Sequence, residues 1–135
     1  MRENLHFPHL WQGIGWLMVV MVCWLSLTPN PPEPPDFLGW DKAQHSAAYA
    51  GLMYWFWQVF HRHWRWPVFL IGLGAILEFL QGLTDHRTPD PFDMAANSMG
   101  VLIGLLLAKT LVVFRVELID HLIWRFCWKK PRTSQ

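Results

Sequence analysis

Four long apolar stretches dominate the sequence, and short polar segments separate them. Residues 10–27 contain no charged side chain, and further apolar runs cover about 43–60, 67–84 and 94–114. Each run is close to the roughly 20 residues that an α-helix needs to cross a hydrocarbon core of about 30 Å. The pattern therefore predicts four membrane spans, at about residues 10–28, 43–60, 67–84 and 94–114.

The first apolar run has a second interpretation, a signal peptide cleaved near Ser26-Leu-Thr28. The run is longer than the apolar core of a signal peptide, and Pro29 follows it directly. A retained helix is therefore the preferred prediction. The proline-rich residues 28–35 that follow cannot form helix or sheet, because proline lacks the backbone N–H, so we expect a stiff connector.

The last part of the chain, about residues 115–130, follows a different pattern. Its apolar stripe consists of Val116, Ile119, Leu122, Ile123 and Phe126, and the residues largely off that stripe are Glu117, Asp120, His121 and Arg125. This pattern predicts an amphipathic helix in the membrane interface. The expected fold is all-α, a single domain over residues 1–135 consisting of an integral membrane four-helix bundle and this C-terminal interfacial helix.

Composition supports the membrane assignment. The chain is 53% hydrophobic and 16% charged, against about 25% charged in soluble domains. Its ten tryptophans fit a protein that anchors at both membrane interfaces. A net charge of +1 gives no electrostatic footprint for nucleic acid, so the lipid bilayer is the expected partner.

Basic residues gather on one side of the predicted spans, the side that the positive-inside rule assigns to the cytoplasm. That side receives Arg2, Arg62, Arg65, Arg115, Arg125, Lys129, Lys130 and Arg132. The other side receives only Lys42 and Arg87 among the basic residues. We therefore predict a multi-pass protein with both termini in the cytoplasm, and the start of the second span and the Arg87 loop on the outer face.

Polar residues recur near that outer face on three of the predicted helices. Asp41, His45 and Tyr49 lie at i, i+4 and i+8, so they share one helix face. Glu78 and Gln81 lie about one turn apart within the third apolar run. On the fourth helix, one stripe holds Asp93, Asn97, Gly100 and Gly104. Polar groups beside hydrocarbon are costly, which makes these residues candidates for a site.

Three interpretations of this convergence stay open. In the structural one, Glu78 pairs with Arg87, Asp93 caps the fourth helix, and His45 and Asn97 form hydrogen bonds across helices. In the second, an outer pocket binds an anionic amphiphile; the candidate binding residues are Lys42, Tyr49, Gln81, Arg87 and Asn97. In the third, the pocket is catalytic; the candidate acids and bases are Asp41, His45, Glu78 and Asp93. The residues do not decide whether the protein is an enzyme.

The same residues could also hold a metal ion. Asp41 and His45 at i, i+4 could share an ion with Glu78 or Asp93. This spacing is common by chance, so the sequence predicts no metal site and identifies no cofactor.

The combined motifs resemble the signature of the VanZ-like family over roughly residues 10–110. The resemblance is carried by three motifs: Asp41-Lys42-x-x-His45-x-x-x-Tyr49, Glu78-x-x-Gln81, and Arg87-x5-Asp93-x3-Asn97-x2-Gly100-x3-Gly104. It implies a small multi-span protein of the bacterial cytoplasmic (inner) membrane. The family is named for a protein associated with teicoplanin resistance, so the resemblance also implies a cell-envelope role and a link to glycopeptide resistance.

Residues and resemblance together give one functional expectation. The protein is expected to bind, and in the catalytic interpretation to modify, a lipid-linked or otherwise anionic amphiphilic envelope component. The alternative is a structural or interaction protein whose polar cluster only holds the helices together.

Overall fold

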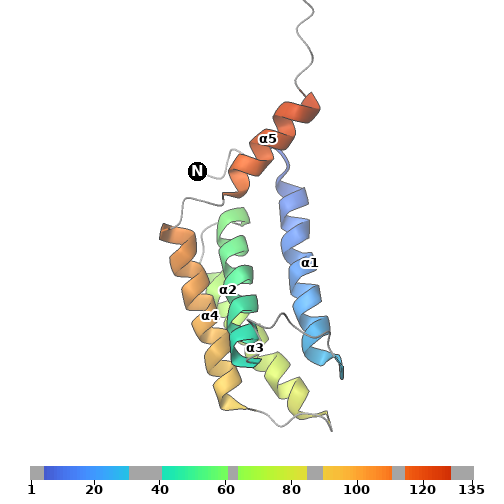
Figure 1. Ribbon diagram of the computed structural model, residues 1–135, viewed down its shortest axis with the longest axis vertical. Helices are drawn as coiled ribbons and strands as arrows, with labels where there is room; N and C mark the ends of the chain where they lie inside the picture. The colour runs from blue at the N-terminus through green and yellow to red at the C-terminus, as the bar shows by residue number, and fades with distance from the viewer. Residues whose placement is uncertain (1–4, 31–40, 61–63, 85–89, 111–114, 129–135) are drawn as a thin grey trace, which may run out of the picture.

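The computed structural model describes residues 5–30, 41–60, 64–84, 90–110 and 115–128, which form five helices and no strand (Figure 1). The helices are α1 (Pro8–Leu27), α2 (Asp41–Val59), α3 (Arg65–Gly82), α4 (Pro91–Thr110) and α5 (Val116–Trp128). The expected all-α class is confirmed. Pro8 and Pro91 each open a helix, where a missing N–H costs nothing.

Successive helices among α1 to α4 run in opposite directions (Figure 1). The C-terminal ends of α1 and α3 therefore lie with the N-terminal ends of α2 and α4, and we call this the site end. The start of α1 lies at the opposite end, where α5 also lies.

Helices α2 and α4 pack more closely than any side chain would allow. A Cβ at Gly100 would collide with the backbone oxygen of Ser46, and one at Gly104 with that of Ala50. The predicted glycine stripe on α4 thus does face small residues of α2. On α3, a Cβ at Gly74 would lie 3.0 Å from the Asn97 amide, whereas a Cβ at Gly72 would meet nothing within 4 Å.

Much of the helical surface is apolar and exposed. On α1, α3 and α4, for example, the exposed fractions of Leu17, Phe79 and Leu106 are 62%, 66% and 61%. Such a surface suits lipid better than water. By length and composition, two described helices, α1 and α4, are candidates for crossing a membrane. The four-span bundle stays a prediction.

Helix α5 is attached through a buried carboxylate. Asp120 is fully buried; it accepts hydrogen bonds from the backbone N–H groups of His6 and Phe7 and from the indole Nε1 of Trp11 at 2.7 Å. Asp120, expected to lie largely off the apolar stripe of this helix, is nevertheless as buried as Val116 of that stripe. The three donors make burial of its charge tolerable. They also outweigh desolvation, so the pKa of Asp120 lies below its usual range.

The predicted apolar stripe of α5 is divided between two faces. Val116 and Ile123 pack against Trp11, while Leu122 and Phe126 are exposed. Part of the stripe therefore serves the protein's own core. An interfacial position for the exposed part stays a prediction.

Candidate functional site

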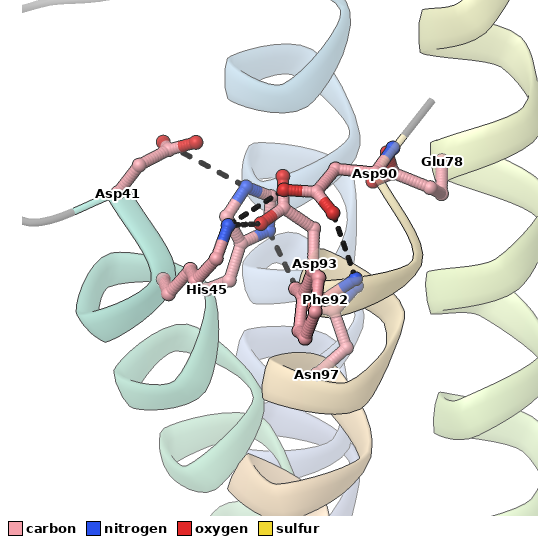
Figure 2. Close-up of polar contacts among 8 residues, drawn as sticks. Asp41, His45, Glu78, Asp90, Phe92, Asp93 and Asn97 are labelled. Atoms are coloured by element: carbon pink, nitrogen blue, oxygen red, sulfur yellow. Dashed lines mark hydrogen bonds and ion pairs between the residues drawn. The ribbon is translucent and has the colours of Figure 1, made fainter. Parts of the chain in front are cut away.

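Polar side chains from three helices meet at the site end. Figure 2 shows Asp41 and His45 reaching from α2 toward Asp93 and Asn97 of α4, with Glu78 approaching from α3. The structure thus brings together all four residues predicted as acids and bases. The spacing along each helix predicts which of these residues share a face. The antiparallel order of the helices then brings the three faces to the same end of the bundle.

Lys42 is held by two carboxylates. Its Nζ donates to Oδ2 of Asp90 at 2.7 Å and to Oδ1 of Asp93 at 3.0 Å. It also lies 5.8 Å from the ring centre of Phe92. Lys42 therefore joins α2 to the start of α4, and its charge is already matched by two negative groups. The Lys42 ammonium, together with the Phe92 N–H, holds the pKa of Asp90 below its usual range.

Asp90 was missed as a site residue by the sequence analysis. Its Oδ1 accepts the backbone N–H of Phe92 at 2.9 Å, and its carbonyl accepts that of Asp93. Asp90, rather than Asp93 as the structural interpretation had it, therefore caps α4. The signal was present in the sequence, because Asp directly before Pro91 is typical of a helix start.

His45 lies between an amide and a carboxylate. Its Nδ1 is 3.2 Å from Oδ1 of Asn97, and its Nε2 is 3.8 Å from Oδ1 of Asp41. Because the amide oxygen can only accept, Nδ1 carries the proton of this hydrogen bond. In the neutral ring, Nε2 then presents its lone pair on the side of the Asp41 carboxylate.

Two buried oxygens near the cluster have no hydrogen-bond partner in the described part of the chain, Glu78 Oε2 and Tyr49 Oη. The other carboxylate oxygen of Glu78 accepts the backbone N–H of Asp90 at 2.8 Å. Glu78 is 5% exposed and Tyr49 is 2% exposed. Leaving such a group unpaired costs about 1–3 kcal/mol, so each needs an explanation.

Three predicted binding residues remain: Gln81, Arg87 and Asn97. Gln81 donates from Nε2 to the carbonyl of Ser26 at 2.6 Å, so it ties α3 to α1. Arg87 lies outside the described residues, so its expected pairing with Glu78 is not addressed by the structure. The amide oxygen of Asn97 is hydrogen-bonded to His45, as the structural interpretation expected.

The ligand-type atoms of Asp41, His45 and Asp93 all lie within 4.8 Å of one another. The described part of the site holds four carboxylates, from Asp41, Glu78, Asp90 and Asp93, against the single ammonium of Lys42. Its chemistry is therefore that of an acid–base or cation-binding site.

The model of the VanZ/LLP1 family matches residues 6–115 of the chain. The chain belongs to the VanZ/LLP1 family. No match was found among curated proteins or among solved structures. The match includes every residue of the VanZ/LLP1 site described above and ends just before α5. Helix α5 and its contact through Asp120 therefore lie beyond the part that defines the family.

Proposed function

We propose that this VanZ/LLP1 protein spans the bacterial cytoplasmic membrane four times and binds the head group of an anionic, lipid-linked envelope component at the site end. The observation that carries the proposal is the pair of buried, unpartnered oxygens beside a polar cluster, Glu78 Oε2 and Tyr49 Oη. A head group with hydroxyl or amide N–H groups would supply the donor that Glu78 lacks.

The surroundings of the cluster suit the rest of such a ligand. Phe79, Leu83 and Phe92 lie next to polar site residues along the chain, and their exposed fractions are 66%, 67% and 70%. A polar cluster with exposed apolar side chains nearby along the chain suits an amphiphile with a polar head and a hydrocarbon chain. Arg87, close to Asp90 in sequence, is suited to a phosphate.

Modification of the bound component is the catalytic form of the same proposal. Asp41, His45 and Asp93 offer ligand-type atoms within 4.8 Å of one another that can give or accept a proton, and Glu78 approaches from α3 beside Asp90. This form predicts a product that accumulates with time when the purified protein is mixed with a lipid-linked substrate.

One specific observation favours the structural alternative. Lys42, His45 and Gln81 each bond to a group on, or directly before, another helix. In that alternative the cluster only holds the bundle together, and loss of any pair lowers stability without any effect on a ligand.

The test uses the full chain in nanodiscs and a polyprenyl diphosphoryl sugar, with the free polyprenol as comparator. Wild-type protein should bind the sugar lipid more tightly than the alcohol. Glu78→Gln places a donor where an acceptor is needed, and Arg87→Lys removes the planar fork, so each should weaken binding about tenfold. Glu117→Gln, on α5, is the matched control.

Equal affinity for both lipids, or no change in either variant, would leave the structural alternative. A link to teicoplanin resistance belongs to the same proposal, because a protein that sequesters an envelope precursor changes the drug's target. Expression of Arg87→Lys should then confer less protection than wild type at equal membrane levels, measured as growth against drug concentration.

A further inference from the structure

We infer that Asp41, His45 and Asp93 form a binding site for a divalent transition-metal ion such as Mn²⁺ or Zn²⁺. The inference deepens the proposed function, and only its last step, the link to the head group, rests on that function. The three side chains come from the first turns of α2 and α4, which the Gly100 and Gly104 contacts hold at close distance.

The ligand atoms of the three side chains are almost as close together as the ligands of one metal ion. One nitrogen and two carboxylate oxygens lie within 4.8 Å of one another, and His45 Nε2 is 3.8 Å from Asp41 Oδ1. Two ligand atoms that each lie about 2.1 Å from a metal are at most roughly 4.2 Å apart. Small side-chain rotations that move the ligand atoms by about half an ångström would therefore complete the site. Three protein ligands leave further positions open to a ligand.

The His45 ring is oriented with Nε2 toward Asp41. Its Nδ1 hydrogen bond to Asn97 fixes the tautomer whose Nε2 lone pair is on the side of Asp41. A metal-binding histidine is normally held in this way through its other nitrogen. Two acceptors that face each other, a lone pair and a carboxylate, are repulsive unless a cation or a proton lies between them.

A further observation concerns Glu78, which is not one of the three proposed ligands. Glu78 reaches from α3 toward the cluster, its Oε1 is bonded to Asp90, and its buried Oε2 has no partner in the described part of the chain (Figure 2). Glu78 therefore places a further carboxyl group next to Asp90, at the edge of the cluster. Lys42 compensates Asp90 and Asp93 only in part, and a carboxylate can bind an ammonium and a metal through its two oxygens.

The mixed ligand set indicates the class of ion. Imidazole nitrogen favours Zn²⁺ and similar metals, while carboxylate oxygens also suit Mn²⁺. An oxygen-preferring ion such as Ca²⁺ gains nothing from His45 and takes more ligands than this set offers. A metal here would accept the phosphate oxygens of an anionic head group, which four carboxylates alone would repel.

The experiment measures Mn²⁺ binding to the metal-free full chain in detergent, by electron paramagnetic resonance and by competition with Zn²⁺ and Ca²⁺. One ion should bind per chain and be displaced by Zn²⁺ but not by equimolar Ca²⁺. Asp41→Asn, at an exposed position, and His45→Gln should each weaken Mn²⁺ binding at least about tenfold. His9→Gln and Glu117→Gln are the matched controls and should bind as wild type.

Two results would overturn the inference: no Mn²⁺ binding by folded wild-type protein, or equal affinity in wild type and Asp41→Asn. The polyprenyl diphosphoryl sugar is added in a second step. Lipid binding that requires Mn²⁺ supports both proposals. Mn²⁺ binding with no lipid binding supports the metal site and overturns the head-group function. Lipid binding unchanged after EDTA treatment, in protein that binds no Mn²⁺, overturns the metal site alone.

Discussion

At the scale of single residues, the site depends on two glycines of α4 that have no side chain. Gly100 and Gly104 let the backbone of α2 approach α4, and this approach brings His45 within 3.2 Å of Asn97. Glycine in a helix costs roughly 1 kcal/mol relative to alanine. The close packing of α2 against α4, which a Cβ at either glycine would prevent, offsets this cost.

Gly100→Ala should destabilise the protein by about 1–3 kcal/mol, because the new Cβ meets the backbone of Ser46, which cannot move like a side-chain tip. Thermal unfolding in detergent gives the comparison. Gly51→Ala is the matched control, since its Cβ meets nothing within 4 Å, and it should be neutral or stabilising. Equal stability of Gly100→Ala and wild type would contradict the close packing.

At the scale of elements, α5 is joined to the start of the chain by a polar anchor inside an apolar contact. Asp120 accepts hydrogen bonds from the backbone N–H groups of His6 and Phe7 and from the Trp11 indole, and its Oδ2 also lies 3.0 Å from Nδ1 of the His6 ring. That ring stacks on Trp124 with centroids 4.5 Å apart. The hydrogen bonds of the carboxylate orient α5 against residues 6–11, while Val116 and Ile123 contribute buried apolar surface. Removing the carboxylate should therefore release the helix without unfolding the bundle.

Asp120→Asn should weaken the attachment of α5 by about 1–3 kcal/mol, because an amide brings a donor into a site with three donors. Hydrogen exchange of residues 116–128 should speed up while that of α2 and α4 does not change. Glu117→Gln on the same helix is the control and should exchange as wild type. If α5 stays protected in Asp120→Asn, apolar packing alone holds it.

The attachment of α5 should also depend on acid. The pKa of Asp120 is lower in the folded protein than in the unfolded chain, where it is about 3.9. Its contribution to stability is therefore complete above that value and is lost as pH falls below it, through the folded pKa. Fluorescence of the tryptophans near α5 should change below about pH 4, and not in Asp120→Asn. A change near pH 6 would assign control to a histidine instead.

At the scale of the whole molecule, the two ends of the bundle differ in chemistry. One end holds the acidic cluster, and the other holds the start of α1 and the helix α5 (Figure 1). The exposed apolar belt between them suits a bilayer. Together with the distribution of Lys and Arg, this predicts that the site faces outward and α5 faces the cytoplasm.

Thiol labelling of intact cells tests that orientation. Thr84→Cys, at an exposed position just after α3, should react with an impermeant reagent from outside in a background lacking Cys23 and Cys127. Native Cys127, exposed on α5, should react only after the membrane is opened. The reverse pattern would invert the topology, and reaction of both from outside would exclude four spans.

The all-α class, the long helices and the convergence of Asp41, His45 and Asp93 could be predicted from the sequence, because apolar runs and helical spacing are local properties. Even Asp90 was readable as a cap from the proline after it. The tertiary structure alone decided which polar groups pair. Gln81 bonds to α1, Lys42 bridges Asp90 and Asp93, and Asp120 is buried. Such pairings depend on how helices distant in sequence are rotated and spaced, which no local pattern specifies.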